Sequence, residues 1–423
     1  MIIFATQSLK NNLVIFARLF GLYSLSHQSC TSSTLHLRKE IYSRKSFTNL
    51  YQLIFSCLLR YILFDRFVPR RPHYFGARNM KFQVDCLMNE NISALSGFPD
   101  GKRYNTFVGY YKRLYGERLQ KLVIDAGFTC PNRDGTVGYG GCSFCDNAAF
   151  HPSYSTVGKS LSMQIDEGIE FHRVRYRNTK HYLAYFQSYS NTYAPLARLR
   201  ELYLEALAHP QIVGIVIGTR PDCIDEEKLD FLADLRDGRV IDGWHRDGFG
   251  SPLVKVEYGI ESCYDKTLER VGRGHDVATA ERAVRLTAER GLEPGAHFIL
   301  GLPGETRLML TEQCSFISSL PLHSVKFHQL QIVKGTRIEK EYAAVPQDFL
   351  RMELPEYLDF VIDILERLRP DLYIERVAGE VPPRFVNETQ WGLVRNFQIL
   401  HMLDDRMAER DTWQGRLAGS NNF

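Results

Sequence analysis

Short apolar, strand-like runs alternate with helical patterns between residues 121 and 333. The predicted strands are 121–125, 181–187, 212–218, 253–259, 296–300 and 324–333, and the predicted helices are 195–208, 225–236, 265–270 and 277–290. Segment 212–218 is apolar almost throughout, as a parallel strand buried on both faces must be. Gly291 supplies a stop signal for the last of these helices. The alternation predicts parallel βαβ units.

Six such units predict an α/β fold with a partial (β/α)6 barrel of the TIM type rather than a full eight-fold barrel. After residue 333 the alternation stops, and the sequence predicts helices at 355–368 and 390–407 with a short strand at 372–375. We therefore divide the chain into a leader, 1–79, a barrel domain, 80–333, whose core begins near residue 121, and a small C-terminal α+β extension, 334–423, that caps the barrel.

The leader differs in composition from the rest of the chain. It carries eleven Lys and Arg side chains but only two acidic ones, Glu40 and Asp65, and no helical or strand period persists in it. Three interpretations are open: a transit peptide, a segment that lies on a membrane through the apolar run 50–64, or sequence upstream of a true start at Met80 or Met88. We favour the third, which predicts that the leader is disordered or is not translated, because so sharp a charge break marks a segment outside the cooperative fold.

The apolar run 50–64 is interrupted by Gln52 and Arg60. Its uninterrupted part is shorter than the roughly 18 residues that a spanning helix needs, so no stable membrane span is predicted. The chain after the leader is mildly acidic. That balance does not favour a broad non-specific nucleic-acid surface, and an RNA partner would need a local basic patch.

Three of the nine cysteines, Cys130, Cys142 and Cys145, lie in one glycine-rich run directly after the first predicted strand. The odd total and the clustering favour metal chemistry in a reducing compartment, the cytoplasm, over a disulfide framework. The other six are scattered and are interpreted as small buried apolar residues. They are Cys30, Cys57, Cys86, Cys223, Cys263 and Cys314.

Thiolates are the usual ligands of iron–sulfur clusters, and three cysteines leave one iron of a four-iron cubane open. A molecule with adjacent amino and carboxylate groups, such as S-adenosylmethionine (SAM), can chelate that iron, and reductive cleavage of SAM yields a 5′-deoxyadenosyl radical. Glycines at 135, 138, 140 and 141 suit a tight loop that offers backbone N–H groups to the sulfurs. The spacing alone leaves open a structural zinc site with His151 as the fourth ligand.

The cysteine run closely resembles that of the radical-SAM proteins of the YhcC-like family, bacterial relatives of the radical-SAM half of the elongator catalytic subunit. The likeness extends from about residue 103 to residue 391. It is carried by segments 126–135, 141–145, 185–195, 218–222, 256–262, 273–275, 301–306, 332–336 and 375–380. The resemblance implies a radical-SAM enzyme with a 4Fe-4S cluster held by Cys130, Cys142 and Cys145, with SAM as the cofactor.

The resemblance also implies which residues meet SAM. Phe144 would pack beside the adenine, and Gly301, Pro303 and Gly304 would line the adenine edge, although the same three also fit a plain strand-to-helix turn. The loop that holds Gln187 and Asn191 would meet the methionine amino group.

Three further side chains receive roles in the same way. Arg220 would face the methionine carboxylate, and its alternative is an ordinary surface ion pair. Glu257 or Glu261 would bind the ribose hydroxyls; an unpaired carboxylate inside an apolar strand, as at Glu257, would be costly. Asn191 and Thr192 alternatively cap the helix that begins near Pro195. The resemblance assigns no catalytic residue for the reaction on the final substrate.

The substrate is the least determined part. Elongator relatives carry an acetyltransferase domain and modify tRNA, and the stretch after residue 334 is too short for such a domain. By kinship, tRNA or another RNA is the leading substrate, and segment 172–181, which interleaves cations with an aromatic residue, is a candidate RNA-facing edge. Its alternative is a solvated helix end. A small molecule or a peptide is the alternative substrate. The expected partner is an electron donor such as flavodoxin or ferredoxin. The further alternative for the whole protein is a non-catalytic iron–sulfur or zinc protein.

Overall fold

The computed structural model describes residue 98 and residues 100–419. The leader 1–79, its apolar run 50–64 and the candidate start sites Met80 and Met88 lie outside the described residues. So do Cys30, Cys57 and Cys86.

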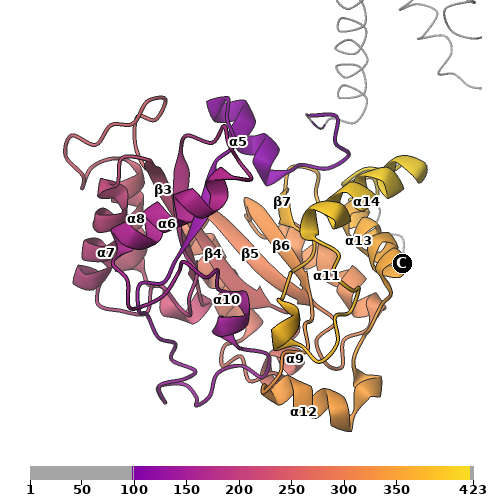
Figure 1. Ribbon diagram of the computed structural model, residues 1–423. Helices are drawn as coiled ribbons and strands as arrows, with labels where there is room; N and C mark the ends of the chain where they lie inside the picture. Colours follow the sequence, from indigo (N-terminus) through magenta and orange to yellow (C-terminus); the bar gives the residue numbers. More distant parts are fainter. Residues whose placement is uncertain (1–97, 99, 420–423) are drawn as a thin grey trace, which may run out of the picture. The chain divides into compact units, whose positions relative to one another are not determined.

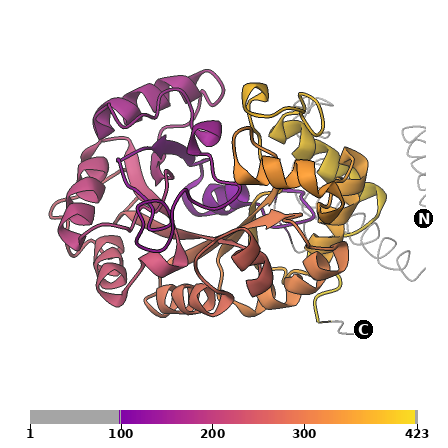
Figure 2. The ribbon, with the colours of Figure 1, turned by 90° about the horizontal axis from the view of Figure 1, so that it is seen from below.

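Seven parallel strands form one sheet in which each strand pairs with the next along the chain. The sheet curls so that the helices lie outside it (Figures 1 and 2), which confirms a partial barrel of the TIM type. The strands are β1 Gln120–Ile124, β2 Tyr182–Phe186, β3 Ile212–Thr219, β4 Leu253–Glu261, β5 Glu293–Leu300, β6 Ser324–Gln329 and β7 Tyr373–Arg376.

Six helices follow the strands and loops of the barrel. They are α6 Leu161–Arg173, α7 Leu196–Ala208, α8 Glu226–Arg236, α9 Asp265–Arg270, α10 Val277–Glu289 and α11 Arg307–Ser319. The helices α6 and α11 were missing from the prediction, although each has a side-chain cap: Ser160 accepts from the N–H of Met163, and Thr306 accepts from that of Met309. These caps were the available sequence signal.

The strand predicted in the C-terminal extension belongs to the barrel sheet itself. It is β7, and it extends the sheet because Val325 of β6 pairs with Ile374 in parallel register. The extension also contains α12 Arg337–Ala344, α13 Leu354–Arg367 and α14 Asn396–Glu409. The helix predicted from residue 390 begins later, at α14, because Gly392 has a φ of 67° and the side chain of Gln398 accepts from the N–H of Arg395 at the start of the helix.

Strand β6 is also shorter than predicted and ends at Gln329. Beyond it, Val333 makes only an isolated bridge to Val386.

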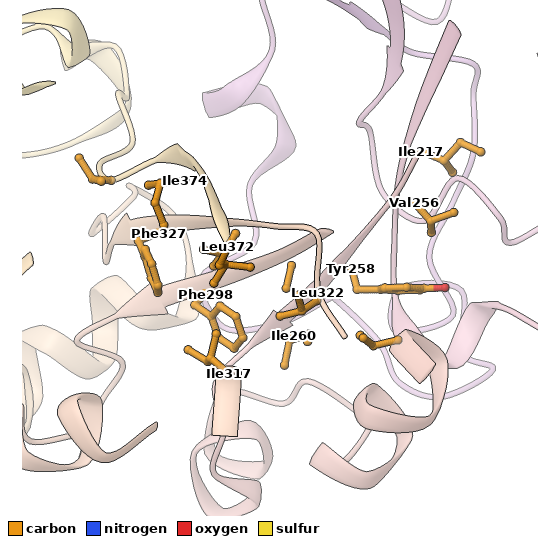
Figure 3. Close-up of a cluster of buried hydrophobic side chains, with 14 of the residues drawn as sticks. Ile217, Val256, Tyr258, Ile260, Phe298, Ile317, Leu322, Phe327, Leu372 and Ile374 are labelled. Atoms are coloured by element: carbon orange, nitrogen blue, oxygen red, sulfur yellow. The ribbon is translucent and has the colours of Figure 1, made fainter. Parts of the chain in front are cut away.

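Side chains on the outer face of the sheet form the main apolar core with the helices. Figure 3 shows this layer, in which Val256, Tyr258 and Ile260 of β4 lie in one cluster with Phe298 and Phe327. The intervening residues of β4, among them Lys255 and Glu257, point to the opposite face because strand side chains alternate. The barrel interior is therefore partly polar.

A helix that precedes β1 packs against the inner side of the sheet. Phe107 and Tyr111 of α5 (Phe107–Tyr115) form a second apolar cluster with Leu183, Tyr185 and Val213. Thr106, just before α5, bridges to Ile374 of β7. Helix α5 thus links the two edge strands.

Within the described part of the chain, every helix is too short or too polar to cross a membrane.

Candidate functional site

The three clustered cysteines lie in a loop that begins just after β1, at the carboxyl ends of the strands. Its first turn is tight, because the N–H groups of Arg133 and Asp134 both donate to the carbonyl of Cys130, at 2.8 and 3.2 Å. The N–H of Gly141 returns to the carbonyl of Asn132 at 2.8 Å. In this class of barrel, ligand-binding loops gather at this rim.

Two glycines of the loop have no room for a side chain. A Cβ at Gly138 would lie 2.4 Å from Oδ1 of Asn132, and one at Gly135, whose φ is 93°, would lie 2.6 Å from the ring of Tyr139. The backbone N–H groups of Gly135, Gly138 and Gly141 donate to carbonyls of the loop itself. The expected tight winding is present, whereas these N–H groups are used within the loop rather than on sulfur.

Side-chain N–H groups contact the sulfurs instead. Nδ2 of Asn132 and Nη1 of Arg273 each lie 3.5 Å from Sγ of Cys142, and Nη2 of Arg133 lies 3.7 Å from Sγ of Cys145. Two guanidinium groups and one amide thus face two of the three sulfurs, as donors that a charged sulfur ligand accepts strongly. Burial and the neighbouring Cys142 raise the pKa of the Cys145 thiol, and the guanidinium of Arg133 offsets this only in part. Neither arginine received a role from the sequence, although Arg133 lies close to Cys130 in the chain.

The loop is fixed to elements far along the chain. The N–H of Ser143 donates to the carbonyl of Val271 at 2.8 Å, and the N–H of Ile338 donates to the carbonyl of Ser143 at 3.0 Å. Phe144 packs on a small apolar cluster that contains Leu302. The structure therefore brings Phe144 and the turn at Gly301 and Pro303 to one place.

The turn at Gly301 needs a residue without a side chain. Gly301 has a φ of 89°, and a Cβ there would lie 2.9 Å from the carbonyl oxygen of Leu350. Pro303 is buried, and the N–H of Gly304 donates to the carbonyl of Asp348 at 2.8 Å. The turn is thus anchored to the loop before α13.

Arg220 is buried, and its guanidinium already donates three hydrogen bonds to two residues. Nε and Nη2 bind the two oxygens of Asp222, at 2.9 and 2.6 Å, and Nη1 donates to the carbonyl of Arg273 at 2.7 Å. The ion pair considered for Arg220 is present, with Asp222, but it does not lie on the surface, because only 2% of the Arg220 side chain is exposed. Its contact with Arg273 places it beside the cysteine loop.

The loop after β2 contains Gln187 and Asn191. Nε2 of Gln187 donates to the carbonyl of Phe150 at 3.5 Å, whereas Asn191 is fully buried and its Nδ2 donates to the carbonyl of Gly218 at 2.7 Å. Thr192 binds the carbonyl of Cys223. The alternative in which Asn191 and Thr192 cap α7 is wrong, because Pro195 is the N-cap and no side chain caps this helix.

The two candidate glutamates of β4 lie in different surroundings. Glu261 ends the strand with a φ of 73°, beside a register shift, and lies 3.7 Å from Nη2 of Arg273. Such a bulge redirects a side chain at a strand end. Glu257, four residues earlier and so about 13 Å further down the strand, binds Lys121, Lys326 and His297 in the barrel interior. Only Glu261 is in contact with Arg273.

Several buried polar atoms around the loop lack a hydrogen-bond partner among the described residues. They are Oγ of Ser143, Oγ of Ser190, Oδ1 of Asn191, Nε of Arg133, Nε of Arg273 and Nε2 of His275. Buried polar atoms are normally paired, so this concentration fits a site that is completed by a bound group. The donor set around the sulfurs fits a negatively charged cluster.

His151 makes contacts away from the sulfurs. Its Nε2 lies 2.8 Å from Oγ of Ser188, and its Nδ1 lies 3.6 Å from Oδ2 of Asp125. Among the residues that the structure describes, no three His, Cys, Asp or Glu side chains converge as a single metal ion requires. In a four-iron cluster each cysteine binds a different iron, so its sulfurs need not converge on one point.

A cavity of about 670 Å³ lies beside the loop. Asn132 and Val137 of the loop line it, together with His275 and the carboxylates of Asp265 and Glu269. Volumes of this size accommodate small molecules.

Glu305 follows the turn at Gly301 and carries a prediction of its own. Its Oε1 accepts from Oγ of Ser262 at 2.5 Å, and its Oε2 has no partner among the described residues. Burial raises the pKa of Glu305 to about 7. As the pH rises from about 4.3, the ordinary pKa of a glutamate, to about 7, the unfolded chain releases the Glu305 proton while the folded chain keeps it. The free energy of unfolding therefore falls as the pH rises through this range.

Glu305→Gln should therefore stabilise the protein by about 2–3 kcal/mol at pH 8 and leave its stability nearly unchanged at pH 4. Urea unfolding at the two pH values measures this difference. Equal stabilities of the variant and the wild type at pH 8 would contradict it.

Comparison with known proteins gives two family matches. The radical SAM superfamily matches residues 130–313, and the Radical_SAM C-terminal domain matches residues 322–409. YhcC of Escherichia coli K12 is 35% identical over 279 residues, which cover 66% of this chain and 84% of YhcC. YtqA of Bacillus subtilis is 32% identical over 321 residues, which cover 74% of this chain and 92% of YtqA.

More distant matches point to the elongator group. A tRNA uridine(34) acetyltransferase of Dehalococcoides mccartyi is 27% identical over 188 residues, 43% of this chain and 36% of that protein. The solved structure of Elp3 from Methanocaldococcus infernus has a TM-score of 0.51 at 14% identity, covering 70% of this chain and 64% of that chain. At this identity the likeness is one of fold.

Proposed function

As a member of the radical SAM superfamily, and within it of the YhcC-like family, the chain is an enzyme, and we propose that Cys130, Cys142 and Cys145 hold a 4Fe-4S cluster that binds and cleaves SAM. When bound and reduced, the cluster supplies the electron that releases a 5′-deoxyadenosyl radical from SAM for hydrogen abstraction. The observation that carries the proposal is the set of N–H donors from Asn132, Arg133 and Arg273 on two of the sulfurs. Hydrogen bonds to the sulfurs and nearby charge tune the potential of such a cluster.

The residues around the loop have separate roles in this proposal. Phe144 packs beside the adenine and the turn at Gly301 and Pro303 lines its edge, since these segments share one apolar cluster. The unpaired Oδ1 of Asn191 is available to the methionine amino group, together with the loop at Gln187. Of the two glutamates, Glu261 is the one we assign to the ribose hydroxyls, because Glu257 is already bound by three cationic or imidazole groups.

The methionine carboxylate has two candidate arginines. Arg220 was expected there, but three of its guanidinium nitrogens are bound to protein oxygens. Arg273 keeps Nε buried and unpaired and already contacts Sγ of Cys142. We therefore propose that Arg273 faces the carboxylate and that Arg220 positions it through the carbonyl of Arg273.

Anaerobic reconstitution with iron and sulfide tests the cofactor. The reconstituted protein, given dithionite and SAM, should produce 5′-deoxyadenosine. A colourless protein that holds one zinc and leaves SAM intact would overturn the proposal in favour of a non-catalytic metal site. In the cell, a flavodoxin or ferredoxin would replace dithionite, and a reducing compartment such as the cytoplasm would keep the thiols available.

We propose RNA, with tRNA first, as the substrate class. One relative is named as a tRNA uridine(34) acetyltransferase, and the end of α6 carries cations on aromatic faces. Cζ of Arg118 lies 4.3 Å from the ring centre of Tyr176, and Cζ of Arg175 lies 5.4 Å from that of Phe397 on α14. Segment 172–181 is therefore joined to a second element rather than being an isolated helix end, which favours an RNA-facing surface.

Arg175→Glu combined with Arg177→Glu should weaken tRNA binding and reduce the salt slope of the binding constant by about two, one for each phosphate contact. Fluorescence anisotropy at several salt concentrations measures the slope. Arg285→Glu, on the exposed face of α10, is the control and should leave the slope unchanged. An unchanged slope in the double variant would remove this surface from the proposal without affecting SAM cleavage.

A small-molecule or peptide substrate is the second candidate. The acidic cavity beside the cysteine loop favours it, because Asp265 and Glu269 would repel phosphates. Profiling of metabolites and of tRNA nucleosides in a deletion strain separates the two classes. A hypomodified nucleoside that is restored by the wild type, but not by Cys145→Ala, would decide for RNA.

A further inference from the structure

The interior of the barrel holds a chain of charged side chains where apolar layers are usual. TIM-type barrels fill their interior mainly with branched apolar residues. Here Lys121, Lys255, Lys326, Glu257 and Glu375, from β1, β4, β6 and β7, occupy it, and no more than 16% of any of these side chains is exposed. Replacing such buried ions by apolar residues is often neutral or stabilising, so stability does not account for them.

These residues, together with His297, form a continuous chain of contacts. Nε2 of His297 lies 3.0 Å from Oε2 of Glu257, and Nζ of Lys121 lies 2.5 Å from both Oε1 of Glu257 and Oε2 of Glu375. Oε1 of Glu375 lies 3.0 Å from Nζ of Lys255. The imidazole can both donate and accept a proton, each ammonium group can donate one, and each carboxylate can accept one.

The Lys255 end of this chain of contacts reaches a cavity. Lys255 lines a cavity of about 100 Å³, together with Tyr110 of α5 and Glu293 at the start of β5. At about 30 Å³ for each molecule, the cavity has room for roughly three waters. Lys255 can therefore exchange protons with water at the end of the barrel where the strands begin.

The other end lies under the cysteine loop. His297 is the register partner of Gly259. The carbonyl of Gly259 accepts from Nη2 of Arg273, whose Nη1 contacts Sγ of Cys142. About a fifth of the His297 side chain is exposed, and the ring of His328 lies beside it at 5.8 Å between centroids. His297 is thus paired with Gly259, whose carbonyl binds the arginine that contacts the cysteine loop.

We propose that His297, Glu257, Lys121, Glu375 and Lys255 form a proton path through the barrel, from the space under the cysteine loop to the cavity at the opposite end. Nδ1 of His297 takes a proton from that space, and Nε2 passes its own proton to Glu257. Lys255 first releases a proton to water, and its neutral amine is then able to take one from Glu375. Lys121 likewise hands a proton to Glu375 before its neutral amine takes the proton that Glu257 received. One proton enters and one leaves, no electron moves, and the ring is left with its proton on Nδ1. The same transfers in reverse return the proton to Nε2, so the path works in both directions.

At rest the path holds a neutral imidazole, two ammonium groups and two carboxylates. The neighbouring lysines outweigh burial and lower the pKa values of Glu257 and Glu375, so each carboxylate carries a proton only transiently. Burial lowers the pKa of His297, as does Lys326, so the ring is neutral at rest and can accept a proton. Burial likewise lowers the pKa values of Lys121 and Lys255, which brings each ammonium nearer to releasing a proton. Three lysines face two glutamates, and this leaves one ammonium without a matching carboxylate.

The test uses exchange of the His297 ring N–H with water in the full-length protein labelled with ¹⁵N-histidine. The signal is assigned by its loss in His297→Gln. Lys255→Met should slow the exchange by about 100-fold, the lower end of the contribution of a positioned proton-transfer group. Lys326→Met is the matched control: it also leaves two lysines and two glutamates, but the path through Lys121 stays complete, so its exchange rate should stay near that of the wild type.

Wild-type exchange in Lys255→Met would overturn the path. Equal slowing of the His297 exchange in Lys255→Met and Lys326→Met would also overturn the path. The slowing would then follow from the loss of a positive charge rather than from a break in the chain of contacts. If Lys255→Met does not fold, Lys255→Gln replaces it, since the amide can still bind Ser324 and Glu375 but cannot relay a proton. Urea unfolding confirms that each variant compared is folded. The test is independent of SAM cleavage, so it stands whatever the outcome for the cofactor.

Discussion

Cys145→Ala should abolish both the bound iron and the cleavage of SAM. Loss of a direct ligand exceeds the 10–100-fold cost of removing an outer-shell partner, so 5′-deoxyadenosine formation should fall by more than about 100-fold. Cys145 is partly exposed, and its replacement leaves the turn made by its own N–H to the carbonyl of Cys142 in place. Iron and sulfide analysis and quantification of 5′-deoxyadenosine after anaerobic reconstitution measure the two effects.

A graded pair of variants separates ligand loss from general damage. Arg133→Ala removes no ligand, but it removes the guanidinium that donates to Sγ and to the carbonyl of Cys145 and lies over the ring of Tyr189. It should cost between about 10- and 100-fold in activity while much of the iron is retained. Cys263→Ala replaces a free cysteine outside the cluster loop and should retain iron and activity. If Cys145→Ala kept its iron, or if Cys263→Ala lost it, the assignment of the three ligands would be wrong.

Glu257→Gln should destabilise the fold by about 3–5 kcal/mol, because it removes one partner of a buried ion network and leaves the others charged. Glu257 is 1% exposed and binds Lys121 and Lys326 directly. Burial alone would raise the pKa of Glu257, but Lys121 and Lys326 outweigh burial and hold it well below its usual range. Urea unfolding at pH 7 measures the cost.

Two comparisons sharpen this prediction. Glu281→Gln breaks an exposed pair with Arg285 on α10 and should cost no more than about 1 kcal/mol. The double variant Glu257→Gln with Lys326→Met should cost less than the sum of its parts, because the second change removes a cation that the first left uncompensated. Strict additivity, or a cost for Glu257→Gln no larger than for Glu281→Gln, would show that the network is well solvated.

The network has a further consequence for acid stability. Burial and Glu257 alone would raise the pKa of Glu375, yet three lysines lower it to about 2. A carboxyl with a lowered folded pKa stabilises the protein above its unfolded pKa, near 4.3, and this contribution is lost as the pH falls toward 2. The barrel interior is therefore one place where acid weakens the fold.

Much of the fold could be predicted because the strands and the outer helices carry local signals. All six strands expected before residue 334 are present, since each has apolar side chains at the positions that face the helices. The strand near residue 372 was also expected, but its membership in the sheet was not, because pairing between Val325 and Ile374 is a long-range choice. Helices α6 and α11 were overlooked in spite of their N-caps at Ser160 and Thr306.

The site was less predictable. Arg220 has a motif signal, but only packing shows that Asp222 and the carbonyl of Arg273 occupy its guanidinium. Glu257 stands out in the sequence as a carboxylate in an apolar strand, but its partners Lys121 and Lys326 are 136 and 69 residues away in the chain. Such partners cannot be identified from spacing.

The sequence by itself determined that the chain alternates strands and helices and that Cys130, Cys142 and Cys145 share one tight loop at the end of β1. Both properties depend on neighbouring residues, through apolar pattern and the conformational freedom of glycine. Only the tertiary structure decided that Arg273 contacts Sγ of Cys142 and that Lys121 and Glu375 meet across the barrel. These contacts exist because the sheet curls and brings β1 and β7 together, and that geometry depends on the packing of the whole barrel.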